Sequence, residues 1–300
     1  MARPAPPPRR LRRRGPPHHA SGAGRILALL PLLLASCAQP PAPPTARHPT
    51  IVSLNPCTDA VLAEVADPGQ ILAVSHFSHD PEASSMGTAR ALRYPAVSGS
   101  VEEIVAYRPD VVVGDYFIGP AAISALDRLG VRLEQFPIET SVADSEAQVR
   151  RLAELAGHPE RGEALIARMR AALARAAPPL EESPLPAVVW QAGGMVPGDR
   201  TLIADLLRRT GFAQLSAVRG LRQGEVLPLE AMLADPPRVI LATGNPLSNE
   251  NRGLAHPALA SLSGTRFEAF PSNLLWCGGP TVIRAAERLA AVRRSLEAAR

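Results

Sequence analysis

The sequence of 300 residues contains no lysine, although it contains 32 arginines. The absence of lysine excludes Schiff-base catalysis through a lysine and phosphate binding through the lysine of a phosphate-binding loop. The motifs GxSxG, HExxH and CxxC are also absent, and no GxGxxG stands between a strand and a helix. These absences argue against an enzyme, and we expect no catalytic residues. An enzyme remains the second class of function, which turnover of a substrate would reveal.

The positive charge of the chain comes from its first residues rather than from the part that should fold. Residues 1–36 hold seven arginines and no acidic residue, so removing them changes the formal charge from +4 to 25 − 28 = −3. The remaining chain therefore gives no reason to expect a nucleic-acid surface. With 46% hydrophobic residues it should be globular and long enough for one large domain or two lobes.

The first 36 residues are predicted to be an export signal. The apolar run ILALLPLLLA has the length of a signal peptide and is too short to span a bilayer. It leads into LASC, which resembles the lipobox of bacterial lipoproteins, and this resemblance makes Cys37 the lipidated first residue of the mature chain. Ordinary cleavage nearby, with Cys37 incidental, is the alternative. Residues 37–49 are proline-rich and predict a tether.

Short β-rich runs and helical patterns alternate from residue 50 onward, and again after residue 178. Near-continuous apolar strands separated by helices are typical of parallel sheets that are covered on both faces. We therefore predict an α/β fold with two lobes, 50–142 and 179–300. The expected strands are 51–54, 71–75, 96–98, 111–114, 131–136, 187–191, 238–243 and 266–270. The expected helices are 58–66, 101–107, 120–129, 201–210, 228–234, 256–262 and 280–298.

The alternation stops between residues 143 and 178, where the pattern is helical with one break at Gly157-His158-Pro159. The part after the break places apolar residues along one stripe, which is typical of an amphipathic helix. A helical stretch without a strand predicts a connector between the lobes.

Two segments of the chain echo one another. VEEIVAYRPDVVV begins at Val101 and LEAMLADPPRVIL begins at Leu229. Each has a glutamate, Glu102 or Glu230, seven residues before a proline. The echo indicates equivalent places in two lobes, each a short helix that leads into a buried strand. Chance recurrence of a helix–proline–strand turn is the alternative.

Together these segments resemble the periplasmic substrate-binding proteins of ABC importers for cobalamin, ferric siderophores and haem. The resemblance covers about residues 50–298 and is carried by IVSLNPCTDAVLAEVADPGQILAVS, SGSVEEIVAYRPDVVVGD, the long mid-chain helix, LPLEAMLADPPRVILAT and WCGGPTVIRAAERL. It implies two α/β lobes with mostly parallel sheets, joined by one long connector helix, with the ligand held in the cleft between them. We also expect a monomer that needs no cofactor.

The resemblance further implies how the protein acts. A lipid-anchored periplasmic protein would capture a metal chelate, a corrinoid or ferric siderophore before haem, and deliver it to an ABC permease and ATPase complex. Glu102 and Glu230 match the acidic residue that each lobe of the relatives presents to an arginine of the permease. The alternative for each is an ordinary glutamate in the first turn of a helix.

Ligands of parallel α/β lobes bind beyond the carboxyl ends of the strands, so the residues that follow the predicted strands are candidates for ligand binding. Both tryptophans and three other aromatic residues are among them, and they could form walls for a flat ligand or merely cover the ends of the sheets. His76 and His79 could also bind a bare transition-metal ion, with help from the cysteines. The candidates are Asn55, Pro56, Cys57, His76, Phe77, His79, Tyr116, Phe117, Trp190, Asn245, Trp276 and Cys277.

Cys57 and Cys277 allow three interpretations: a disulfide, separate thiols in the cleft, or thiolate ligands of a metal. Each cysteine follows a predicted strand, Cys57 in the first lobe and Cys277 in the last segment. A disulfide between them would then join the lobes across the cleft and block closure. We therefore expect two separate thiols.

Overall fold

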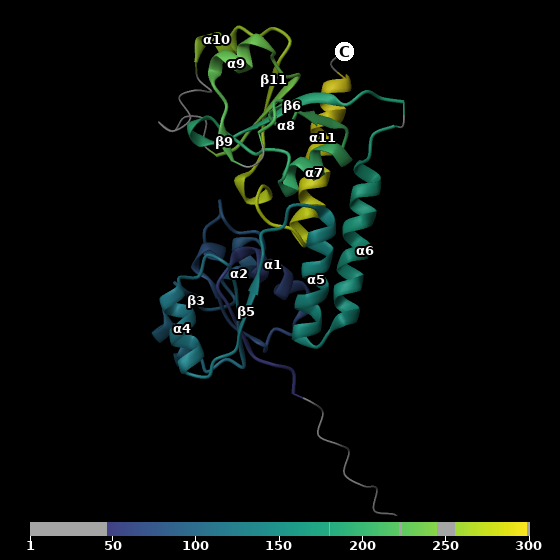
Figure 1. The fold of residues 1–300 in the computed structure, drawn as a ribbon. Helices are drawn as coiled ribbons and strands as arrows, with labels where there is room; N and C mark the ends of the chain where they lie inside the picture. Colours follow the sequence, from purple (N-terminus) through teal and green to yellow (C-terminus); the bar gives the residue numbers. More distant parts are fainter. Residues whose placement is uncertain (1–46, 180, 222–223, 245–255, 299–300) are drawn as a thin grey trace, which may run out of the picture. The chain divides into compact units, whose positions relative to one another are not determined.

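The computed structural model describes residues 47–179, 181–221, 224–244 and 256–298, which are coloured in Figure 1. The predicted signal peptide, most of the predicted tether with Cys37, and the candidate ligand residue Asn245 lie outside these residues. None of the helices that the structure describes is long and apolar enough to cross a membrane.

The N-terminal lobe is built around a five-stranded sheet in the order β3-β2-β1-β4-β5, in which every neighbouring pair is parallel. Alternate residues of β1 and β4 belong to two separate apolar clusters, because successive side chains of a strand point to opposite faces. Both faces of this sheet are therefore covered. Its elements are β1 (Ile51–Ser53), α1 (Pro56–Val65), β2 (Ile71–Ser75), η1 (His76–His79), α2 (Thr88–Ala91), β3 (Ala96–Val97), α3 (Val101–Ala106), β4 (Val111–Asp115), α4 (Pro120–Arg128) and β5 (Leu133–Phe136).

The C-terminal lobe has a parallel sheet in the order β11-β10-β6-β8 and a small antiparallel pair, β7 with β9. Its strands are β6 (Leu185–Trp190), β7 (Met195–Val196), β8 (Phe212–Gln214), β9 (Glu225–Val226), β10 (Val239–Ala242) and β11 (Arg266–Ala269). Its helices are η2 (Ala192–Gly194), α7 (Leu202–Arg209), α8 (Leu215–Val218), α9 (Leu229–Ala234), α10 (Pro257–Ala260), η4 (Ser272–Leu274) and α11 (Pro280–Ala298).

The prediction of an α/β fold with covered parallel sheets is confirmed, and each expected strand and helix is present within about two residues of its predicted ends. The sequence analysis missed β8, the β7–β9 pair and the short helices α2 and α8. These elements have two to four residues each, which is too short for a hydrophobic period to show.

The two echoing segments occupy equivalent places in the two sheets. The first forms α3 and β4, and the second forms α9 and β10. In each sheet this strand pairs with the first strand of its lobe, β4 with β1 and β10 with β6. The architectural interpretation of the echo is therefore confirmed.

Two helices of the predicted connector, α5 (Val142–Ala156) and α6 (Pro159–Ala176), form a hairpin. The chain reverses at Gly157, whose φ of 80° suits a glycine, and Pro159 starts the next helix where its missing N–H costs nothing. The predicted break is thus confirmed.

The C-terminal helix α11 packs along α6, and Figure 1 shows the two side by side. Apolar residues of α5, α6 and α11 join one continuous core with residues of both sheets, from Ile51 in β1 to Val189 in β6. Residues 46–300 form a single compact unit, so the predicted division at residues 142 and 178 remains a prediction.

Candidate functional site

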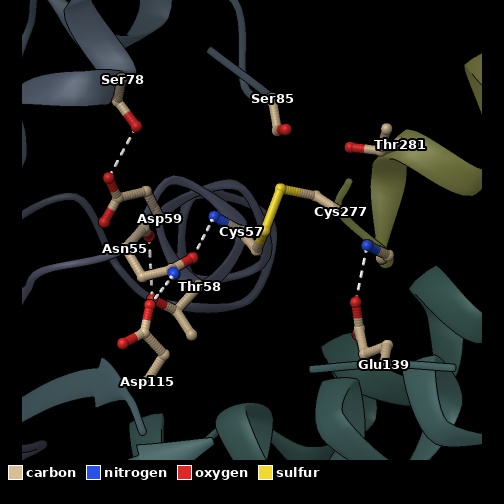
Figure 2. The surroundings of a disulfide bond; sticks show 12 residues. Asn55, Cys57, Thr58, Asp59, Ser78, Ser85, Asp115, Glu139, Cys277 and Thr281 are labelled. Carbon is tan, nitrogen blue, oxygen red and sulfur yellow. Dashed lines mark hydrogen bonds between the residues drawn. A yellow bond between two sulfur atoms is a disulfide. The ribbon is translucent and has the colours of Figure 1, made fainter. Parts of the chain in front are cut away.

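The start of α11 is attached to the N-terminal lobe by backbone hydrogen bonds. The Gly278 N–H donates to Glu139 Oε2 at 2.7 Å, and the Gly279 N–H donates to Ser145 Oγ at 2.7 Å. Figure 2 shows Glu139 reaching toward this backbone beside the disulfide. The loop after β5 and the first turns of α5 thus receive a segment from the other end of the chain.

The two glycines of the WCGGP motif are required by this close approach. A Cβ at Gly278 would overlap the hydroxyl of Ser145 and the carboxylate of Glu139. Gly279 has a φ of 56°, which other residues rarely adopt, and a Cβ there would meet Val61 of α1. The motif therefore fits the start of α11 against α1 and α5.

Cys57 and Cys277 form a disulfide with their α-carbons 4.9 Å apart, so the prediction of two separate thiols is wrong. The bond also removes both thiolates as possible ligands of a bare metal ion. The error lay in assigning Cys277 to the C-terminal lobe because it follows a strand of that lobe.

The segment after β11 in fact leaves its own sheet and crosses to the N-terminal lobe. The Ser272 hydroxyl donates to the Glu82 carbonyl at 2.9 Å, and the Asn273 amide donates to the Pro81 carbonyl at 3.1 Å. Cys277 therefore arrives beside α1, where Cys57 is the second residue of the helix. The disulfide ties the base of α11 to α1.

A pocket of about 190 Å³ lies beside this junction, at the carboxyl ends of β1, β4 and β5. Four of the predicted ligand-binding residues line it: Asn55, Cys57, Phe117 and Trp276. It is smaller than the ~300–1,000 Å³ of typical small-molecule sites, so it suits the edge or a side group of a large ligand. The remaining lining residues are Thr58, Asp115, Phe136, Pro137, Ile138, Glu139 and Gln148.

A polar network holds one wall of the pocket. Asn55 Oδ1 accepts the Cys57 N–H at 2.7 Å and so caps α1, while Asn55 Nδ2 donates to Asp115 Oδ2 at 2.5 Å. Asp115 Oδ1 in turn accepts the Phe117 N–H at 2.8 Å. Figure 2 shows Asn55 between Cys57 and Asp115. This network fixes the loop that presents Phe117.

Aromatic side chains are exposed around the pocket. Phe117 is 76% exposed and Trp276 is 60% exposed, although both line it, and the neighbouring Tyr116 is also exposed. Large apolar faces that are left open to water mark surfaces that bind a partner or a ligand. The prediction that Trp190 forms such a wall is wrong, because Trp190 is 3% exposed and packs in the core of the C-terminal lobe.

The predicted candidates of η1 stand apart from this pocket. His79 Nε2 lies 3.2 Å from the carbonyls of Ala91 and Tyr94, and His76 Nδ1 lies 3.3 Å from the carbonyl of Val97. One nitrogen of each ring is thus used to donate to the backbone. Phe77 is half-exposed, and Pro56 is the first residue of α1 without lining the pocket.

Asp59 of α1 fixes the position of η1. Its Oδ2 accepts the Ser75 N–H at 2.9 Å and the Ser78 hydroxyl at 2.6 Å. Burial raises the pKa of Asp59 to about 7, although these hydrogen bonds act in the opposite direction. Its carboxyl is therefore a buried structural group that holds the loop after β2 (Figure 2).

Glu139 is the buried acid of the pocket. Burial raises its pKa to about 7, and the hydrogen bond from the Gly278 N–H opposes that rise. Its Oε1 is buried and has no hydrogen-bond partner among the described residues. Near neutral pH the carboxyl can therefore carry a proton and donate a hydrogen bond to a ligand.

Glu139 and Gln148 are two of the seven pocket residues that the sequence analysis did not select. Glu139 follows β5 by three residues, so the rule of inspecting strand ends would have found it had it been applied to this strand as well. Gln148 lies within α5, and no signal in the sequence marks it as a pocket residue.

The chain belongs to the periplasmic binding protein family, whose model matches residues 51–262. The members of this family are binding proteins of the periplasm rather than enzymes. The comparison with curated proteins gave no match.

Solved structures of haem-binding and vitamin B12-binding proteins share the fold. The periplasmic haem-binding protein RhuT from Roseiflexus sp. RS-1 is 22% identical with a TM-score of 0.67, over 83% of this chain and 99% of that one. The haem-binding protein HutB of Vibrio cholerae is 17% identical with a TM-score of 0.68, and the match covers 82% of this chain and 99% of that one. The vitamin B12-binding protein BtuF of Vibrio cholerae is 16% identical with a TM-score of 0.65, and the match covers 83% of this chain and 97% of that one. This likeness shows the two-lobe fold.

Replacing Glu139 with Gln should change how stability depends on pH. Because the folded pKa is near 7 and the usual value is 4.5, the unfolded chain loses this proton first. The free energy of unfolding therefore falls as pH rises from the usual pKa of 4.5 to the folded pKa near 7. Above the folded pKa the loss is roughly 3 kcal/mol. Glu139→Gln keeps a neutral acceptor for Gly278 and should gain stability relative to the natural protein between pH 5 and pH 8.

Urea unfolding at pH 5 and at pH 8 measures the stability of Glu139→Gln relative to the natural protein. Glu154→Gln, at an exposed residue of α5, is the control. The control should differ from the natural protein equally at both pH values. An equal difference for Glu139→Gln as well would contradict the assignment of a buried, protonated acid.

Proposed function

We propose that this protein is the substrate-binding component of an ABC importer and that it captures a metal chelate, with a corrinoid as the first candidate. The observation that carries the proposal is the pocket at the strand ends, where exposed Phe117 and Trp276 stand beside the Asn55 and Gln148 amides. Aromatic walls with a few fixed polar groups suit a large flat ligand that has polar side groups.

The charges of the pocket support a corrinoid over more anionic chelates. Its eleven lining residues include two carboxyl groups, Asp115 and Glu139, and no arginine or histidine. A ferric catecholate or the propionates of haem would meet no cation from these residues, whereas the carboxamides of a corrin can pair with amides and with a protonated acid. Haem and ferric siderophores are the next candidates.

The alternative of a bare metal ion at His76, His79 and the cysteines has no comparable support. The two sulfurs are bonded to each other. Within the described part of the chain, these histidines do not join a group of three potential metal ligands.

Titration with a corrinoid, haem and a ferric catecholate, followed by visible absorption, tests the proposed cargo. We expect saturable binding of the corrinoid without turnover, and about tenfold weaker binding for Trp276→Ala and for Phe117→Ala. Phe267→Ala, at an exposed aromatic residue of β11 outside the pocket, should bind normally. Failure of all three chelates to bind, or normal binding by both pocket variants, would reject the proposal.

Delivery to the permease is proposed to use Glu102 and Glu230. Both are exposed in the first turns of α3 and α9, at the equivalent places of the two lobes. An exposed ion pair contributes only about 0–1 kcal/mol, so these glutamates would act on orientation and encounter rate.

Charge reversal should therefore impair uptake without changing affinity for the ligand. Glu102→Arg and Glu230→Arg are compared with Glu154→Arg, an exposed glutamate of α5, in cells that depend on the imported ligand. Normal uptake by both variants would reject the docking role of Glu102 and Glu230, and the two echoing segments would then be only equivalent parts of the fold.

The protein is further proposed to be held at a membrane through a lipid on Cys37. The support is the apolar run that ends in LASC, followed by a proline-rich stretch. Cys37→Ser should move the mature protein from the membrane fraction to the soluble periplasm. Unchanged partitioning of this variant would reject the anchor.

A further inference from the structure

Three potential metal ligands meet in the N-terminal lobe, outside the pocket described above. His48 comes from the start of the described chain, Asp67 from the loop between α1 and β2, and His158 from the turn between α5 and α6. One ligand atom from each lies within 4.8 Å of the others. His48 is exposed, Asp67 is partly buried and His158 is buried, so the group is open to solvent on one side.

The surrounding contacts fix two of the three ligands. His158 Nε2 lies 3.2 Å from Asp67 Oδ2 and 3.1 Å from Gln70 Oε1. Gln70 Nε2 donates to the carbonyls of Pro49 at 3.0 Å and Ala156 at 2.9 Å. The same glutamine therefore ties the residue after His48 to the end of α5, and the three segments are held together before any ion arrives.

His48 is seated closely on the turn. Its ring centroid lies 4.3 Å from that of His158, with the planes tilted by 41°. A Cβ at Gly157 would overlap the ring of His48. Gly157 thus serves the position of His48 as well as the reversal of the chain.

We propose that His48, Asp67 and His158 form a binding site for a divalent transition-metal ion, with Zn²⁺ as the ion that suits the ligands best. Two imidazoles and one carboxylate make a three-residue set that leaves a fourth position for water. At zinc–ligand distances of about 2.0–2.2 Å, tetrahedral ligand atoms stand about 3.4 Å apart. Asp67 Oδ2 and His158 Nε2, which lie 3.2 Å apart, already have nearly this spacing. The His48 nitrogen lies within 4.8 Å of both, so the exposed ring of His48 is the part that would adjust.

The neighbours of the site fit this role. Glu160 Oε1 lies 3.7 Å from Nδ1 of His158, where a carboxylate can orient an imidazole that binds a metal through its other nitrogen. Arg161 bonds Asp67 through Oδ1 at 2.8 Å and so leaves Oδ2 for the ion. Its positive charge opposes the ion, but it also holds the carboxylate in place.

Binding would join the start of the described chain to the α5–α6 turn, because the ligands come from three separate segments. The ion would replace the proton that His158 Nε2 shares with Gln70 and Asp67. The site is independent of the cargo pocket, since none of its ligands lines that pocket. The competing role for these residues is a hydrogen-bonded contact that needs no metal.

Zn²⁺ alone, titrated into the metal-free mature protein against a chromophoric chelator, tests the proposal. We expect one ion per chain and a rise in melting temperature with Zn²⁺. His48→Ala and Asp67→Asn should each weaken binding about tenfold or more and abolish that rise. His48 is exposed, so its variant should fold, which circular dichroism verifies. His256→Ala, at an exposed histidine of the C-terminal lobe, should bind as the natural protein does.

Three results would overturn the proposal. They are an absence of stoichiometric binding, equal binding by His48→Ala and the natural protein, and loss of the ion in His76→Ala instead of His48→Ala. The last result would place the ion at η1 instead. If the protein bound none of the chelates, the proposed Zn²⁺ site would not be affected. The proposal of a chelate cargo and the proposal of a Zn²⁺ site can therefore fail separately.

Discussion

A covalent attachment joins the base of α11 to α1, and both the arrangement of the helices and the candidate site follow from it. The disulfide between Cys57 and Cys277 closes a loop with a sequence separation of 220 residues. By loop-closure entropy such a bridge contributes about 5 kcal/mol, against about 1 kcal/mol for each of the hydrogen bonds from Gly278 and Gly279. The covalent bond therefore dominates, and the glycines make the close approach possible.

This attachment also builds the candidate site. It brings Trp276 from the last segment of the chain to the strand ends of the N-terminal lobe, where Trp276 and Phe117 line the same pocket. It places the Gly278 N–H on Glu139 and so buries an acid beside the pocket. Because α11 then packs against both α6 and α7, it adds to the helical packing between its base and the C-terminal sheet, and we expect any closing motion to be small.

Much of the fold could be predicted from the sequence because its signals are local. Apolar runs gave the strands, proline and glycine gave the break at Gly157, and the echo gave the matching places of α3 and α9. Of the residues that line the pocket, the same rule selected Asn55, Cys57, Phe117 and Trp276. The rule wrongly selected Trp190, because an aromatic residue at a strand end can equally fill a core. It omitted Glu139, because it was not applied to the residues that follow β5. The pairing of Cys57 with Cys277 depends on a crossing of the chain between lobes, which no local pattern shows.

Counting the free thiols of the exported Cys37→Ser variant, by mass measurement after alkylation, shows whether α11 is tied to α1 by the disulfide. Only Cys57 and Cys277 then remain in the chain. The disulfide predicts no alkylated cysteine in the ligand-free protein and two after reduction and unfolding. Two alkylated cysteines before reduction, in protein unfolded to expose them, would contradict the attachment of α11 on which this account depends.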